Sequence, residues 1–410
     1  MTRPGGPDAT ERTAPPPTLD PSGAPTATDG GDLSRQERLA ARDEVEEVAP
    51  GILRIQLPIM LPGLGHVNCY AFEDDRGVTL VDPGLPDPGS AAVLNSRLAS
   101  IGIPLTRVHT VVVTHSHPDH FGGAGRLRVE QRCEVVAHDD FVTPFDPQPV
   151  DAELTELEVR GAPGADRTRA AADLSDLDGP FNDRLAEVLF GDGPVPDIPA
   201  RSTPYGEDGY KPAPGEIEWM RSWDEASKKG LLSLRPTERV ADRQWLSLGG
   251  REFQALHTPG HTGDHLCLWD PDSGVLLSGD HVLPTITPHI SGLTPSEDAL
   301  AEFVAALHRV AELPGVTRVL PAHGLPFDDV ASRVGEIVAH HEDRLDRIGA
   351  IVRAHGDAGV RTVSRELFDE RSWGPMAESE TYAHLEHLRI AGHMRRSTDA
   401  TGRLVYSASD

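Results

Sequence analysis

Four residues that can bind a metal ion lie close together in the segment VVVTHSHPDHFGG, residues 111–123. They are His115, His117, Asp119 and His120, and they directly follow an apolar run that predicts a buried β-strand. His115 and His117 are two positions apart, so an extended loop directs both imidazoles to the same side. Asp119 and His120 follow a proline that turns the chain, so they can face a second ion. One loop is therefore predicted to supply ligands to two metal ions.

Three further candidate ligands follow turns or apolar runs later in the chain. His261 lies in HTPGHTGDH, Asp280 ends LLSGD, and His323 ends VLPAH. Zinc usually takes four nitrogen or oxygen ligands, and seven ligands with one shared carboxylate suit two ions about 3.5–4 Å apart. Histidine and carboxylate ligands also accept iron or manganese, so the sequence does not choose the metal. The pattern predicts a centre of two ions, and zinc is the metal that the family resemblance described next implies.

These segments are similar to the metal motifs of the metallo-β-lactamase superfamily of hydrolases. THSHPDHFGG, HTPGHT, SGDH and PAHG occur in the order of that family, and LVDPG resembles its first motif. The resemblance covers residues 50–330 and implies an αββα sandwich with the metals at one edge between two sheets. It implies roles for eight residues: His115, His117 and His261 on the first ion, Asp119, His120 and His323 on the second, Asp280 as the bridge and Asp82 as a brace of the metal loop.

Two features are similar to the glyoxalase II-related branch of the family. Asp280 stands where drug-hydrolysing lactamases carry a cysteine ligand, and HVNCYAF resembles the N-x-Y strand of that branch. The resemblance implies a dinuclear hydrolase in which a metal-bound hydroxide attacks a small acyl substrate, a thioester or a related ester. Asp119 and Asp280 are the expected catalytic residues, with Asp119 orienting the attacking water. His289, in the loop after Asp280, is a candidate substrate contact.

Two other activities stay open. The same pair of ions can stabilise phosphoryl transfer in an endoribonuclease or phosphodiesterase. The sulfur dioxygenases of the superfamily hold a single iron through residues that match His115, His261 and Asp280. Arginines near the C-terminus could contact nucleic acid, but acidic residues are interspersed among them. A non-catalytic binding module is disfavoured because the ligand set is complete.

Hydrophobic periodicity predicts the elements that position these residues. Apolar runs closed by turn residues predict strands, and two longer segments predict hairpins. Between residues 141 and 236 the pattern breaks into helical pieces and stretches rich in Pro and Gly, which indicates an insertion over one face of the core. Four aromatic residues of this insertion are candidate pocket lining: Tyr205, Tyr210, Trp219 and Trp223. The predicted strands are GILRIQLPI, HVNCYAFED, GVTLVDPG, LTRVHTVVV and CEVVAHDD; the predicted hairpins are LGGREFQALHT and DHLCLWDPDSGVLLSGD.

The sequence predicts three parts. Residues 1–44 are rich in Pro, Gly, Thr and Ala and are expected to be disordered. Residues 45–335 form the catalytic domain, with 141–236 as the insertion or lid. Residues 336–410 are similar to a winged helix and could bind nucleic acid, pair two chains or complete the pocket; His340 and His341 within them are expected to be solvated. The fold class is α/β, an αββα metallo-β-lactamase sandwich with a helical insertion and a small C-terminal winged-helix-like domain.

Composition limits the partners. The 410 residues include 38 Lys and Arg against 65 Asp and Glu, a formal net charge of −27, which disfavours nucleic acid and anionic membranes. There is neither a secretory signal nor an apolar run of about 18 residues. Cys69, Cys133 and Cys267 are far apart, which favours reduced thiols and a cytoplasmic location. The expected partner is a small-molecule substrate; nucleic acid is not favoured, and a homo-oligomer stays open.

Overall fold

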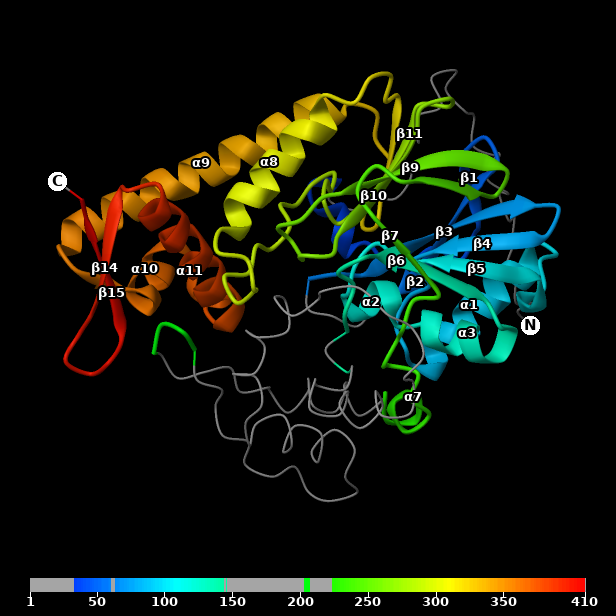
Figure 1. The fold of residues 1–410 in the computed structure, drawn as a ribbon, viewed down its shortest axis with the longest axis horizontal. Helices are drawn as coiled ribbons and strands as arrows, with labels where there is room; N and C mark the ends of the chain where they lie inside the picture. The colour runs from blue at the N-terminus through cyan, green and yellow to red at the C-terminus, as the bar shows by residue number, and fades with distance from the viewer. Residues whose placement is uncertain (1–32, 60–62, 144, 146–202, 207–222, 410) are drawn as a thin grey trace, which may run out of the picture. The chain divides into compact units, whose positions relative to one another are not determined.

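Two β-sheets packed face to face, with helices on both outer sides, form the framework of the protein in the computed structural model (Figure 1). The structure describes residues 33–59, 63–143, 145, 203–206 and 223–409. The layers follow the order helix, sheet, sheet, helix, which confirms the predicted α/β sandwich. Among the helices that the structure describes, none combines the length and the apolar character needed to cross a bilayer. Cys69, Cys133 and Cys267 are buried and free.

The first sheet has seven strands in the order in which they occur along the chain. Its first four strands pair antiparallel and its last four pair parallel. Parallel neighbours need a crossover, and helices α1 (Pro88–Ser100) and α3 (Ala124–Gln131) supply two of them. The carboxyl ends of β4, β5 and β6 therefore meet at one edge. The strands are β1 (Glu46–Ala49), β2 (Ile52–Pro58), β3 (His66–Asp74), β4 (Gly77–Val81), β5 (Val108–Val112), β6 (Glu134–His138) and β7 (Glu238–Val240); the short helix η2 (Leu105–Arg107) precedes β5.

The second sheet has five strands in the order β12-β11-β10-β9-β8. Gly249 and Gly250 join β8 to β9 with φ values of 56° and 70°, the conformation of a tight type I′ hairpin turn. The antiparallel pairs β8–β9 and β10–β11 confirm both predicted hairpins. Helix α8 (Ala299–Ala311) crosses from β11 to the parallel strand β12. The strands are β8 (Trp245–Leu248), β9 (Arg251–His257), β10 (Leu266–Asp270), β11 (Val275–Gly279) and β12 (Arg318–Pro321).

Three apolar layers hold the sandwich together. Between the sheets, the rings of Phe72 and Phe253 lie 5.5 Å apart at their centroids. Leu98 of α1 packs beneath the first sheet, while Leu300 and Phe303 of α8 pack over the second. Burying each such side chain contributes roughly 1.5–3 kcal/mol. The strand ends at the edge of the sandwich are thus carried by a rigid framework.

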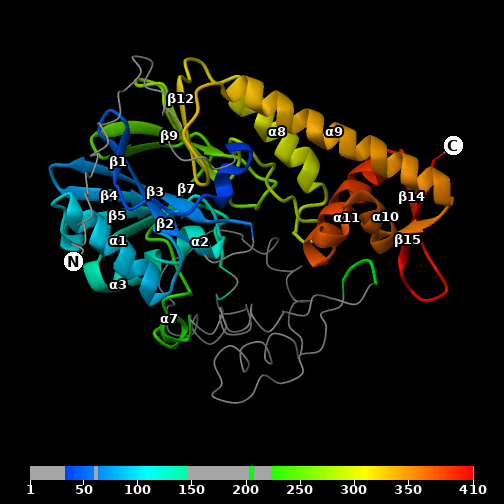
Figure 2. The same ribbon diagram turned by 180° about the vertical axis from the view of Figure 1, so that it is seen from behind.

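Residues 330–408 form a module of three helices and a small sheet (Figure 2). Its three strands pair antiparallel in the order β13-β15-β14, and the buried Tyr406 lies in its apolar core. Residues Arg35–Asp410 form one compact unit, and the predicted domain boundary at residue 336 falls inside α9. The elements are α9 (Val330–His355), β13 (Ala358–Gly359), α10 (Val360–Leu367), η4 (Glu370–Ser372), α11 (Pro375–Ile390), β14 (Met394–Thr398) and β15 (Leu404–Ala408).

The predicted disorder of residues 1–44 is wrong for residues 33–44, which the structure describes. A short helix, η1 (Leu33–Arg38), opens the described chain. The carboxylate of Glu37 accepts a hydrogen bond from Thr285 Oγ1 at 2.9 Å, and Leu39 O accepts one from His66 Nδ1 at 2.7 Å. The composition changes from Pro and Gly to LSRQERLAAR at this point, so the signal for order was present.

Most of the predicted insertion, residues 141–236, lies outside the described residues, including Tyr210, Trp219 and the predicted helical pieces DAELTELEVRG and FNDRLAEVLFG. The described part contains helix α7 (Asp224–Lys228). Tyr205 is buried against Tyr382 of α11, and Trp223 is buried in the apolar layer beneath the first sheet. Both aromatic residues therefore pack into the apolar core of the described chain.

Candidate metal centre

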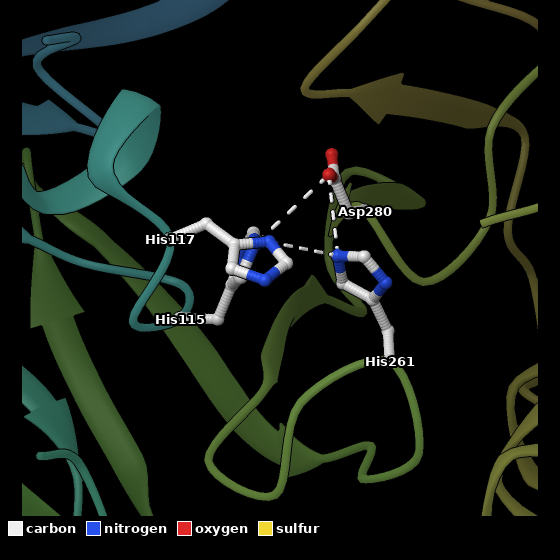
Figure 3. Close-up of side chains that lie close together, drawn as sticks. All are labelled: His115, His117, His261 and Asp280. Atoms are coloured by element: carbon white, nitrogen blue, oxygen red, sulfur yellow. Dashed lines mark hydrogen bonds and ion pairs between the residues drawn. The ribbon is translucent and has the colours of Figure 1, made fainter. Parts of the chain in front are cut away.

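Three histidines and one aspartate meet at the edge of the two sheets (Figure 3). His115 and His117 come from the loop after β5, His261 from the loop after β9, and Asp280 directly follows β11. His117 Nδ1 lies 3.1 Å from both His115 Nε2 and His261 Nε2. Asp280 Oδ2 lies 3.5 Å from His261 Nε2 and 3.9 Å from His115 Nε2. Three nitrogens and one oxygen thus converge, which is a common ligand set of zinc. We call these four residues the first group.

Asp119, His120 and His323 form the second group. Asp119 Oδ2 lies 3.4 Å from His120 Nε2 and 3.5 Å from His323 Nε2. Asp280 lies between the two groups, since its Oδ1 is 3.3 Å from His323 Nε2 and its Oδ2 is 3.6 Å from His120 Nε2. The short helix α2 (Pro118–Phe121) starts at the proline of the motif and turns Asp119 and His120 toward this side. The structure therefore brings all seven predicted ligands together in the predicted grouping.

Three buried atoms at this place have no hydrogen-bond partner among the described residues: His120 Nε2, His323 Nε2 and Asp280 Oδ1. A buried polar atom without a partner costs about 1–3 kcal/mol. Because these atoms face one another across a few ångströms, cations bound between them would satisfy all three. The residues present therefore fit bound divalent metal.

Asp82 holds the metal loop from behind. It follows β4 with a φ of 54°, a left-handed conformation that aspartate tolerates better than most residues. Its carboxylate accepts hydrogen bonds from Thr114 N at 2.9 Å, Thr114 Oγ1 at 2.8 Å and His120 Nδ1 at 2.9 Å. Donation from Nδ1 leaves the Nε2 lone pair of His120 free for a metal. The carboxylate thus lies where the resemblance predicts a brace.

Two other histidines are oriented by backbone carbonyls. His323 Nδ1 donates to His66 O, and His261 Nδ1 donates to His289 O, each at 2.7 Å. Both therefore present Nε2 to the centre. The sequence analysis missed these two acceptors because any residue type has a carbonyl.

His265 is a further residue that the sequence analysis missed. Its Nε2 accepts a hydrogen bond from Asp280 N at 3.0 Å, and its Nδ1 is 2.7 Å from Thr258 Oγ1. The side chain is fully buried. It therefore fixes the backbone at the bridging aspartate. It lies directly before β10 and ends the loop of His261, but this position alone gave no signal for the contact.

The model of the metallo-beta-lactamase superfamily matches residues 62–203 and 204–323, more than half of the chain. The chain belongs to the metallo-β-lactamase superfamily. Members are generally metal-dependent hydrolases, and the two ligand groups fit that chemistry.

Curated relatives are similar over part of their length. The Beta-lactamase-like protein 2 homolog of Caenorhabditis elegans is 29% identical over 134 residues, 33% of this chain and 43% of the relative. The Lactamase-like protein aptB of Emericella nidulans is 29% identical over 148 residues, 35% of this chain and 45% of the relative. The chain thus spans less than half the length of these two relatives. The probable metallo-hydrolase YqjP of Bacillus subtilis is 24% identical over 305 residues, 72% of this chain and 79% of that protein.

Solved structures extend the similarity to nearly the whole chain. A metallo-beta-lactamase family protein of Thermus thermophilus has a TM-score of 0.63 and 25% identity, covering 88% of this chain and all of that chain. A beta-lactamase domain protein of Burkholderia ambifaria has a TM-score of 0.64 and 24% identity, covering 90% of this chain and 95% of that one. The second likeness concerns the fold alone.

The second group of this metallo-β-lactamase-fold centre holds protons tightly in the absence of metal. Burial lowers the pKa of a histidine, but Asp119, Asp280 and Asp82 raise the pKa of His120 well above its ordinary value. The pKa of His323 is also raised, against the effect of burial, by Asp280 and Asp119. Burial raises the pKa of Asp119, yet His120 and His323 lower it to about 2. An ion at the second group must therefore displace protons.

The first group is electrostatically different. Burial, followed by repulsion from His261, lowers the pKa of His117 to about 3. Burial, with His120 and His117 nearby, lowers the pKa of His115 well below its ordinary value. Both imidazoles are thus neutral at neutral pH and ready to bind a metal.

A third cluster of ligand-type residues includes none of the seven predicted ligands: His138, Asp140 and His257. The imidazoles of His138 and His257 stack with centroids 3.9 Å apart and planes 15° apart. A metal ion lies in the plane of each imidazole that binds it, and two nearly parallel planes at this separation cannot share one ion. Asp140 is also largely exposed, so this arrangement is not a metal site.

Two other histidines, His289 and His341, were also considered in the sequence analysis. The side chain of His289 has its Nδ1 3.5 Å from Glu380 Oε2, and substrate contact by this residue stays a prediction. The prediction that His341 is solvated is wrong, because the residue is 1% exposed and its Nδ1 lies 3.0 Å from His384 Nε2. Helices α8 and α11 cover that side of α9.

Proposed function

We propose that this protein is a dinuclear metal-dependent hydrolase of a small acyl substrate, a thioester or a related ester. The observation that carries the proposal is the convergence of seven buried or half-buried ligand side chains in two groups that share Asp280. We propose zinc as the metal, because histidine nitrogens with one or two carboxylates are its usual ligands. The proposal places the chain with the glyoxalase II-related members of the superfamily, which an aspartate at the bridging position supports.

When bound, two divalent ions supply an activated water and neutralise negative charge that develops on the substrate oxygen. The side chains of this protein hold the reacting groups in place. Asp119, whose pKa is about 2, stays ionised at neutral pH and accepts the hydrogen bond that orients the attacking water. Asp82, His66 and His289 keep the imidazoles turned toward the centre, so that little reorganisation is needed during the reaction.

The second group argues against a mono-iron dioxygenase. One ion at His115, His261 and Asp280 would leave His120 Nε2 and His323 Nε2 buried without partners. Unpartnered buried nitrogens are costly, so two ions fit this chain better.

The C-terminal module gives little support to a nuclease. Its element order, with a three-stranded sheet, supports the winged-helix-like interpretation. However, Arg389 and Arg396 both bind the carboxylate of Glu386 at 2.9 Å, so this acid offsets part of their positive charge. Together with the net charge of −27, this favours a small-molecule substrate over nucleic acid.

The test is hydrolysis of a panel of short acyl-thioesters by the zinc-loaded protein, with Asp280→Asn as the variant. Because Asp280 lies between both groups, we expect at least an approximately 100-fold loss of turnover together with reduced bound zinc. Asp270→Asn is the matched control: Asp270 is a buried carboxylate at the end of β10 that binds Arg251 at 2.8 Å, away from the centre.

Full turnover by Asp280→Asn would contradict the two-ion proposal. A fully loaded wild-type protein without thioesterase activity would contradict the acyl substrate, and single-stranded RNA would then be the next substrate. Iron in the purified protein with oxygen-dependent activity would favour the dioxygenase.

A further inference from the structure

The loop of residues 281–298 lies between the metal centre and helix α11. It begins directly after Asp280, and within it His289 O accepts the hydrogen bond of His261 Nδ1. It ends at Asp298, the N-cap of α8, whose carboxylate is 3.0 Å from His387 Nδ1 of α11. The loop therefore contacts the centre at one end and the C-terminal module along its length.

Helix α11 touches this loop at closely spaced points. Gly292 N donates to Ser379 O at 3.2 Å, and the hydroxyls of Ser291 and Ser379 lie 2.9 Å apart. A Cβ atom at Gly292 would lie 2.7 Å from Ala383 N, closer than real contacts allow. The close approach of the two backbones thus depends on glycine, which indicates a fixed docking of the loop on α11.

Glu380 is the charged residue at this contact. One of its carboxylate oxygens lies 3.5 Å from His289 Nδ1, and the other binds the guanidinium of Arg344 from α9. The side chain is 13% exposed. Burial raises the pKa of this carboxyl, but His289 and Arg344 lower it to about 2. The group is therefore an ionised carboxylate that is held from two sides and faces the His289 imidazole.

We propose that Glu380 is a positioning residue of the metal centre: it anchors the His289 side chain, and the His289 carbonyl in turn sets the orientation of the His261 imidazole. The inference rests on the proposed function, because His261 matters as a metal ligand. The C-terminal module then forms part of the support of the centre, a role in addition to the three that its sequence left open. His289 acts through both its ends, with its carbonyl on His261 and its ring on Glu380.

The first test compares two glutamates of the same helix. Glu380→Gln removes the charge that anchors His289. Glu378→Gln is the matched control, because Glu378 has the same 13% exposure and binds Arg361 of α10 at 2.8 Å, away from the loop. We expect Glu380→Gln to weaken the binding of zinc to the first group by about tenfold. This is the lower end of the losses expected when a residue that orients a metal ligand is changed. We expect Glu378→Gln to stay within about twofold of wild type.

The measurement is zinc titration against a competing chelator, together with the visible absorption spectrum of the cobalt-substituted protein. The spectrum reports the ligand field of the ion directly, so a merely structural role of Glu380 would leave it unchanged. We expect a shifted cobalt spectrum in Glu380→Gln and a wild-type spectrum in Glu378→Gln. If Glu380→Gln has the same zinc affinity and the same cobalt spectrum as Glu378→Gln, the inference is overturned.

A second variant tests whether a weaker zinc affinity of Glu380→Gln comes from a folding defect. His289→Ala keeps the carbonyl but removes the ring that Glu380 anchors, so it should weaken zinc binding to a similar extent. Because both changes break one chain of contacts, the double variant should lose little more than either single variant. Additive losses would overturn the inference. If the wild-type protein binds no metal, the proposed function and this inference are both overturned. If the wild-type protein binds zinc and Glu380→Gln binds it equally well with an unchanged cobalt spectrum, this inference alone is overturned.

Discussion

The two ligand groups differ at the level of single imidazoles. His117 and His115 have pKa values lowered by burial, while His120 and His323 have pKa values raised by the carboxylates around them. A histidine must lose its proton from the ligating nitrogen before it binds a metal. His115 and His117 therefore bind a metal with less competition from protons than His120 and His323.

Occupancy of the second group should consequently depend on pH. Because the carboxylates raise the pKa values of His120 and His323, these imidazoles keep a proton to higher pH than an ordinary histidine, so binding at the second group releases protons and weakens as the pH falls. Lowering the pH from about 8 to about 6 should weaken the binding of the second ion more than that of the first, by up to about tenfold per pH unit for each proton released. Isothermal titration in buffers of different ionisation enthalpy measures this release. Equal pH dependence of both ions would contradict it.

The types of the ligand residues made the centre predictable, but the orientation of those residues did not follow from the sequence. His115, His117 and the other ligands are chemically specific residues at strand ends, so motif and position point to the same place. Their acceptors are mostly backbone carbonyls, such as those of His66 and His289. A carbonyl leaves no mark in the sequence, and neither does the long-range contact of Glu380.

At the level of elements, the end of β11 places the bridging aspartate. Gly279 closes that strand with a φ of 51°, and a Cβ there would lie 2.6 Å from His265 Nε2. The same nitrogen accepts the hydrogen bond of Asp280 N. A glycine at this position therefore allows the strand to end and the histidine to reach the backbone of the aspartate.

Gly279→Ala should destabilise the protein through both effects. A left-handed alanine costs about 1–2 kcal/mol, and the contact with His265 should add roughly 1–3 kcal/mol, as in an overpacked core. Gly315→Ala is the matched control, because Gly315 has a φ of 72° but nothing within 4 Å of its Cβ position. Urea-induced unfolding of the two variants measures the difference. If both variants lose the same free energy of unfolding, the His265 side chain moves away from the added methyl group without a measurable loss of stability.

Strands and hairpins were predictable where apolar residues alternate between turn residues, as in β2, β3 and the β8–β9 pair. The order of residues 33–44 had a signal in the change of composition, but the hydrogen bonds to distant residues that hold this segment could not be predicted from the sequence. Most of the insertion at 141–236 lies outside the described residues, and its role as a lid stays a prediction. Tyr205 and Trp223 show that an aromatic residue in such a segment can serve the core instead.

On the scale of the whole molecule, the C-terminal module and the sandwich share a core. Ala383 of α11 lies in the same apolar layer as Phe303 of α8, and α9 continues across the predicted boundary at residue 336. The single compact unit from Arg35 to Asp410 is consistent with this sharing. Metal binding should therefore also stabilise the C-terminal module, although this module contributes no ligand.

Hydrogen exchange gives a test of that coupling in the intact protein. Metal binds the folded centre, so it stabilises whatever opens together with that centre. Zinc loading should slow amide exchange in the loop 281–298 and in the first turns of α11 by about tenfold, which corresponds to about 1.4 kcal/mol. The β14–β15 hairpin, Met394–Ala408, serves as the internal control, because it lies at the end of the module remote from the sandwich (Figure 1) and should not change. If zinc slows exchange only in the ligand loops, the C-terminal module is not coupled to metal binding.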